Sequence, residues 1–63
     1  MFNVYAQTHS GIWEKIDSFD SEEKAIHRAN RLNEDKYHKA IVVNKSKELG
    51  DSIAYSCEFD RER

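Results

Sequence analysis

The chain of 63 residues contains no proline, two glycines and a single cysteine. With Cys57 alone, no internal disulfide can form, and an unpaired thiol is typical of a reducing compartment. Two glycines are too few for a glycine-rich loop that binds phosphate. No apolar run is long enough to span a bilayer, and the first residues lack the pattern of a signal peptide. We therefore expect a cytoplasmic protein with no membrane partner.

Groups that bind metals or perform catalysis are few and scattered. His9, His27, His38 and Cys57 are far apart and form no CxxC or HxxxH pair, so we expect no metal site and no cofactor. Cys57 falls within an alternating apolar segment, where cysteine usually packs as a small hydrophobe. A domain of this size also lacks the bulk to enclose a deep pocket. We therefore predict that the protein is not an enzyme and has no catalytic residues.

Apolar periodicity predicts two β-hairpins separated by one helix. Residues 2–19 form two strand-like segments on either side of a turn at Gly11, and the first alternates strictly, as a half-buried strand does. Residues 39–59 predict a second hairpin with its turn at Gly50. The charged tail at 60–63 is expected to fray.

Two patterns in the second hairpin predict how its strands are covered. The run AIVVN at 40–44 is continuously apolar up to its last residue, which is typical of an interior strand covered on both faces. The following strand alternates apolar and polar residues. One face of it is expected to carry Ile53, Tyr55, Cys57 and Phe59.

The segment SEEKAIHRANRL predicts a helix over residues 21–33. Its apolar residues recur at helical spacing: Ala25, Ile26, Ala29 and Leu32. Asp20 and Ser21 are equally good N-caps, and Asp20 with Glu23 fits a capping box. The order of elements is ββαββ. We therefore predict a single α+β domain, an antiparallel four-stranded sheet with one helix packed on one face.

With these elements in place, the chain resembles the small ββαββ domains of unknown function found in bacteria and their phages. The resemblance rests on the first hairpin, the helix start FDSEEKAIHRA and the strand AIVV, and it covers most of the chain. It implies a compact cytosolic accessory domain and supplies no catalytic residues.

A second set of side chains on the predicted helix is basic: Lys24, His27, Arg28 and Arg31. Lys24 and Arg28 are like charges at i,i+4, which destabilises a helix by about 0.2–0.5 kcal/mol. Residues 24–47 carry seven Lys or Arg against two carboxylates. An anionic partner would offset this repulsion, so we treat the basic stripe as a candidate partner-binding site. A solvated helix face is the alternative interpretation.

One helix covers only one face of a four-stranded sheet, so the other face is open unless a partner covers it. Depending on register, this open face carries Tyr5, Trp13 and Tyr55, a second candidate partner-binding site. Aromatic residues anchor protein interfaces, and in some RNA-binding domains they stack on unpaired bases. Packing in the core is the alternative for each of the three.

These features predict a small non-enzymatic protein-interaction module, an accessory or inhibitory protein of bacterial or phage origin. It acts through the open sheet face, the basic helix face, or both. A second copy of the chain, forming a homodimer, is one expected partner, because short chains gain stability by oligomerisation. The alternative function is weak, largely sequence-independent nucleic-acid binding through the basic stripe. Acidic segments at 1–23 and 48–63 would repel nucleic acid, which makes it the second choice.

Overall fold

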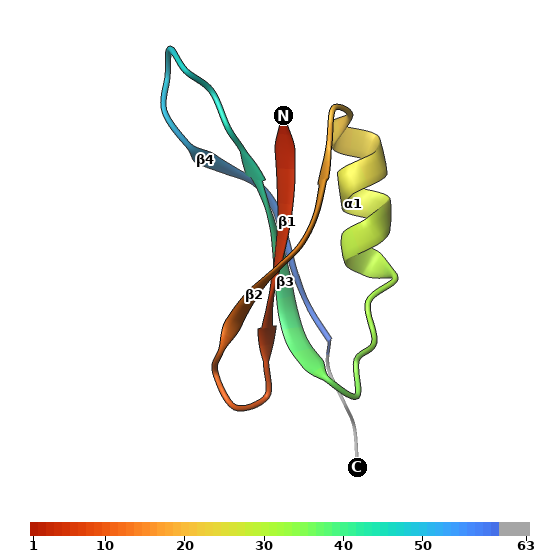
Figure 1. The fold of residues 1–63 in the computed structure, drawn as a ribbon. Helices are drawn as coiled ribbons and strands as arrows, with labels where there is room; N and C mark the ends of the chain where they lie inside the picture. Colours follow the sequence, from red (N-terminus) through yellow and green to blue (C-terminus); the bar gives the residue numbers. More distant parts are fainter. Residues whose placement is uncertain (60–63) are drawn as a thin grey trace.

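The computed structural model describes residues 1–59 and contains four strands and one helix (Figure 1). In chain order these elements are β1 (Phe2–Thr8), β2 (Trp13–Phe19), α1 (Glu22–Asn30), β3 (Tyr37–Asn44) and β4 (Ser52–Glu58). The predicted tail at 60–63 lies outside the described residues.

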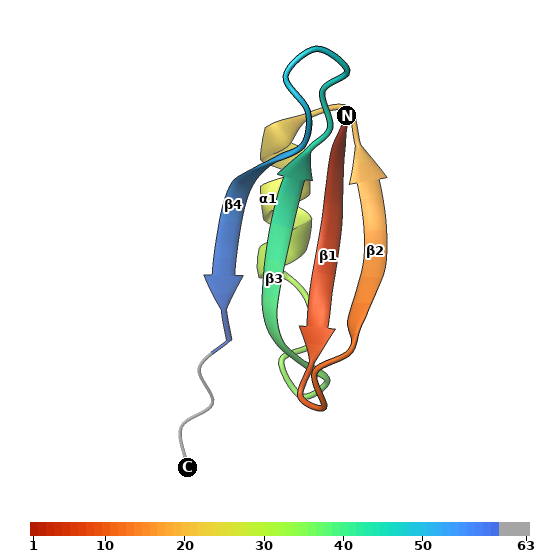
Figure 2. The same ribbon diagram turned by 90° about the vertical axis from the view of Figure 1, so that its left-hand side faces the viewer.

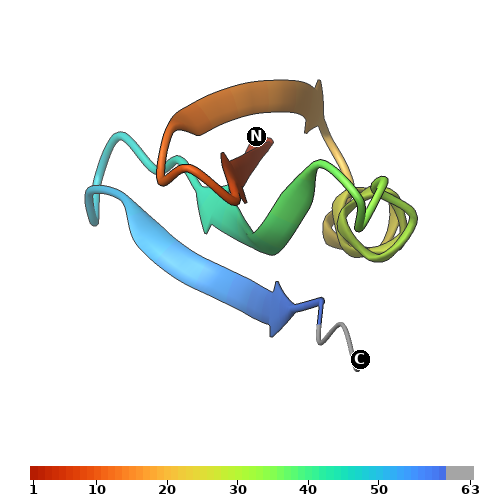
Figure 3. The same ribbon diagram turned by 90° about the horizontal axis from the view of Figure 1, so that it is seen from below.

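The strands form one antiparallel sheet in the order β2-β1-β3-β4, so β1 and β3 occupy its centre. Helix α1 lies along one side of the twisted sheet, with β2 and β4 at the two edges (Figure 3). The other side, which faces the viewer in Figure 2, is covered by no element of the described chain. The predicted α+β fold, ββαββ with one helix on one face, is confirmed.

The core lies between α1 and the two central strands. Its fully buried residues are Val4, Ala6, Ala25, Ala29, Ala40 and Val42. Every second residue of β1 and β3 faces the helix, because side chains alternate across a strand, and Val4 stands opposite Val42. Ala25 and Ala29 are four residues apart and therefore lie on the same face of α1. Their short side chains let the helix approach the sheet closely.

Strand β3 is central but is covered on one face only. Val42 is fully buried under the helix, whereas Ile41 and Val43 point to the open side and are only half-buried. The prediction that residues 40–44 are covered on both faces is therefore wrong for the described chain. The continuous apolar run therefore supplies two different faces of β3. One face is buried under the helix, and the other is apolar but accessible.

Two irregularities in register decide which side chains share a face. In β2, Asp17 pairs with Val4 and Lys15 pairs with Tyr5, so Ile16 is an extra residue in the strand. Such a bulge reverses the alternation beyond it. As a result, Trp13 lies on the open side, while Phe19 packs on the helix side against the core.

A similar shift occurs in β4, where Tyr55 pairs with Val42 and Ile53 pairs with Val43. Ala54 is the extra residue there. Tyr55 and Cys57 pack against the core, but Ile53 stands opposite a residue of the open side and is 65% exposed. The prediction that Ile53 shares a face with Tyr55 is therefore wrong, because the bulge interrupts the two-residue period.

The helix begins with Ser21 as its N-cap and ends at Asn30, three residues earlier than predicted. Ser21 has an extended backbone, and its hydroxyl accepts a hydrogen bond from the Lys24 N–H at 3.4 Å. Beyond the helix, the Asn33 side chain accepts from the Asp35 N–H at 2.9 Å. Local bonds of this kind compete with helical ones, which explains why the helix stops before Asn33.

Substitution of the two adjacent valines of β3 tests this core. We expect Val42→Ala to lower the free energy of unfolding by about 2 kcal/mol, since it removes two fully buried methyl groups and leaves a cavity. Val43→Ala, the matched control on the open side, should lower it by less than about 1 kcal/mol. Urea titration followed by Trp13 fluorescence measures both. Equal losses would contradict the assignment of Val42 to the core.

Candidate functional site

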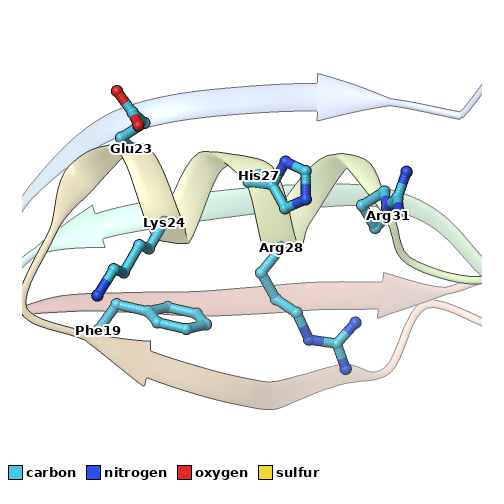
Figure 4. Close-up of a pocket in the computed structure, with 6 residues that line it drawn as sticks. All are labelled: Phe19, Glu23, Lys24, His27, Arg28 and Arg31. Atoms are coloured by element: carbon cyan, nitrogen blue, oxygen red, sulfur yellow. The ribbon is translucent and has the colours of Figure 1, made fainter.

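A groove with a volume of about 490 Å³ runs along the outer side of α1 next to the end of β2. It is lined by Phe19, Glu23, Lys24, His27, Arg28 and Arg31 (Figure 4). Four of these residues belong to α1, and Arg31 is the residue that caps its C-terminal end. Phe19 is the last residue of β2, the strand that precedes the helix. The groove is therefore built almost entirely by local chain geometry.

All four basic residues predicted as a partner-binding stripe line this groove. His27, Arg28 and Arg31 follow Lys24 by three, four and seven residues, which places all four on one side of an α-helix. Figure 4 shows Lys24 and Arg28 extending from the helix toward β2, with the Phe19 ring between them. The structure thus brings the predicted basic stripe together on a hollowed surface.

Two residues of the groove, Glu23 and Phe19, were absent from the predicted stripe, and Phe19 is the one that adds an apolar surface. It is half-buried, packs against the core, and presents its ring to the groove. The available signal was its position at the end of β2, two residues before the Ser21 cap. A side chain so close to the helix start is held near the first helical turn. The groove therefore combines an apolar aromatic surface with cationic side chains.

The charges of the groove are only partly compensated. Arg28 Nε lies 3.9 Å from Asp17 Oδ2, and both side chains are nearly half exposed, so solvent weakens this pair. Within residues 1–59, Lys24 and Arg31 form no ion pair. Glu23 lies in the first turn of the helix, where a carboxylate interacts favourably with the helix dipole. A ligand with an apolar group and one or two anionic groups complements this arrangement.

The structure separates the three aromatic residues predicted for the open face. Tyr5 and Trp13 do lie there. Tyr5 and Gln7 alternate with the buried residues of β1 and therefore point to the open side, and Trp13 pairs with Gln7 and shares its face. Tyr55 lies on the helix side, and its hydroxyl donates a 2.8 Å hydrogen bond to Asn30 Oδ1. The assignment of Tyr55 to the open face is therefore corrected, because its register opposite Val42 directs it toward α1.

Other chemistry-bearing side chains are placed apart from this groove. His38 Nε2 lies 2.7 Å from Gln7 Oε1, and His9 Nε2 lies 3.0 Å from the carbonyl of Glu34. In the described part of the chain, no group of three or more His, Cys, Asp or Glu side chains is positioned to hold a metal ion. Likewise, α1 is too short and too polar to cross a membrane.

Comparisons of the chain with protein families, with curated proteins and with solved structures gave no significant match. The resemblance to small ββαββ domains of bacteria and phages therefore stays a prediction. Any assignment of function to the groove depends on its own geometry and charge.

Cys57 gives a test of packing on the helix side of β4. Burial raises the pKa of the Cys57 thiol above its ordinary value of 9.0, although hydrogen bonds to the Ala40 backbone and the Tyr55 side chain oppose this effect. A raised thiol pKa favours the protonated, folded form, so this contribution to stability is present below pH 9 and is lost as pH rises through the folded pKa.

We expect the rate of Cys57 alkylation by iodoacetamide to rise with a midpoint above pH 9.0 in the folded protein. In urea, where the thiol is solvated, the midpoint should return to about 9. The chain has no other cysteine, so the measurement needs no background correction. A folded midpoint at or below that of the unfolded chain would show that Cys57 is not desolvated.

Proposed function

We propose that this protein is a small, non-enzymatic binding module that recognises an acidic segment of another protein through the groove beside α1. The observation that supports the proposal is a groove lined by four basic side chains and an aromatic ring, with Lys24 and Arg28 on either side of Phe19 (Figure 4). Phe19 offers a contact for an apolar side chain of the partner. Lys24, Arg28 and Arg31 offer charge-assisted hydrogen bonds to its carboxylates.

The energetics of the helix support a partner of opposite charge. Lys24 and Arg28 are i,i+4 neighbours of like sign, an arrangement that slightly destabilises an isolated helix. Asp17 relieves Arg28 only in part, from a distance of 3.9 Å. A bound carboxylate between Lys24 and Arg28 would remove this repulsion and would gain from the exclusion of water beside Phe19.

A protein partner fits the surroundings of the groove better than nucleic acid does. Glu23 lines the groove and Asp17 lies beside Arg28. A nucleic-acid backbone carries regularly spaced phosphates and would meet these carboxylates as well as the basic residues. A peptide can place one or two carboxylates at Lys24 and Arg28 and keep uncharged groups elsewhere. Nucleic-acid binding through the same stripe is the second choice.

The proposed role is that of an accessory or inhibitory protein, and the resemblance to small bacterial and phage domains implies the accessory role. We place it in the cytoplasm, because the unpaired Cys57 suits a reducing compartment. Recognition through a shallow, charged groove would give fast and reversible association, since exposed charges mainly raise the rate of encounter.

Replacement of the basic groove residues tests this proposal. A fluorescein-labelled hexapeptide with one phenylalanine, two glutamates and three serines serves as the probe, titrated by fluorescence anisotropy. We expect Lys24→Ala, Arg28→Ala and Arg31→Ala together to weaken its binding about tenfold, because three exposed charge contacts are lost. Binding by the parent should also weaken with added salt, as screening requires.

The matched control carries Lys36→Ala, Lys45→Ala and Lys47→Ala, which change the net charge equally but lie outside the groove. It should bind the peptide as the parent does. If both variants bind the peptide equally weakly, the loss of binding is due to the change in net charge and not to the groove. No binding of the peptide by the parent would contradict the proposal, and tighter binding of a 16-nucleotide single strand or duplex would favour nucleic acid instead.

A further inference from the structure

The open face of the sheet carries apolar side chains that contribute nothing to the core. Tyr5, Ile41 and Val43 are half-buried by their neighbours, yet in the described chain none of them packs against the core cluster. Trp13 and Ile53 are 44% and 65% exposed. The register places these five large apolar residues on the face that no element covers, and a surface of this kind is normally covered by a partner.

The register arranges this face in rows that cross all four strands. The central row, from β2 to β4, is Lys15, Tyr5, Ile41 and Ser56. The row next to it, toward the first hairpin turn, is Trp13, Gln7, Lys39 and Glu58. Tyr5 and Ile41 therefore form an apolar pair at the centre of the face, Lys39 lies beside them on β3, and the oppositely charged Lys15 and Glu58 lie on the two edge strands.

We propose that a second copy of this chain covers the open face, related by a two-fold axis parallel to the strands. This axis stacks β1 of each copy on β3 of the other. Each row of residues then faces the same row of the second copy. Tyr5 of one copy then packs on Ile41 of the second, and the contact occurs twice. The centre of the interface is thus aromatic on aliphatic, the pairing that interfaces favour.

Charge complementarity selects this axis. It places β2 of one copy over β4 of the other, so Lys15 stands over Ser56 of the second copy and its long side chain extends to Glu58 in the adjacent row. A two-fold axis across the strands would instead stack each strand on itself. It would bring Lys15 against Lys15 and set the exposed Ile53 near Glu58. Like charges at close range disfavour that arrangement.

The size of the face sets the expected strength of this dimer. Four strands of about seven residues, at about 4.8 Å spacing and 3.3 Å rise, give a face of roughly 450 Å². Two copies would bury about 900 Å², which is typical of weak, reversible association rather than of an obligate dimer. The face is opposite the groove beside α1, so dimerisation leaves the groove accessible and does not depend on its function.

Sedimentation equilibrium of the parent chain, from micromolar to millimolar concentration, should show a reversible monomer–dimer equilibrium. Ile41→Glu should remove the dimer, because it places two carboxylates in the central contact. Its circular dichroism should remain that of the parent, since Ile41 is not part of the core. Leu49→Glu, the same kind of change at an apolar residue that is 91% exposed in the turn between β3 and β4, is the matched control and should dimerise as the parent does.

Two further variants test the axis. Lys15→Glu and Glu58→Lys should each weaken the homodimer about tenfold, because each substitution sets like charges together twice. An equimolar mixture of the two variants should form a heterodimer with the parent's affinity, since both edge contacts are then complementary. A parent that stays monomeric at millimolar concentration would overturn the proposal. A dimer that is insensitive to Lys15→Glu, or a mixture that shows no recovery, would overturn this arrangement.

Discussion

The packing of two alanines against two central strands determines how the rest of the molecule is arranged. Ala25 and Ala29 are fully buried against the sheet, where Val4 and Val42 face each other. Because neither alanine has a long side chain, the helix backbone lies close to the strands and its rotation about its own axis is fixed. Larger residues at these positions would push the helix outward and cost about 1–3 kcal/mol of stability.

The orientation of the basic stripe is a consequence of this contact. Lys24 and Arg28 each precede a buried alanine by one residue, which places them about 100° around the helix from the core. That rotation carries both side chains toward β2 and the Phe19 ring (Figure 4). The groove therefore requires no dedicated loop. Its lining comes from the helix, the residue that follows it and the last residue of β2.

Sequence periodicity predicts the elements of this fold but not the faces of its edge strands. The strict alternation of residues 2–8 and the helical spacing of Ala25 and Ala29 were sufficient, because each signal is repeated within its own segment. The bulges at Ile16 and Ala54 leave no comparable signal. Each inserts one residue into a pairing that depends on the neighbouring strand. This explains why Tyr55 could not be assigned to a face from the sequence, and why the contribution of Phe19 to the groove was missed.

The two faces of the sheet differ in what they offer a partner. On the helix side, the groove combines the Phe19 ring with basic side chains, which suits a ligand that carries an apolar group and carboxylates. On the open side, Tyr5 and Ile41 are apolar at the centre of the face, and Lys15 and Glu58 lie on its opposite edge strands. A chain of this length buries only about 60% of the surface of its unfolded form, so additional burial has a large relative effect on its stability. If a second copy covers the open face, folding and association are linked, and the stability of the protein depends on its concentration. The groove, on the opposite side, remains available in both the monomer and the dimer.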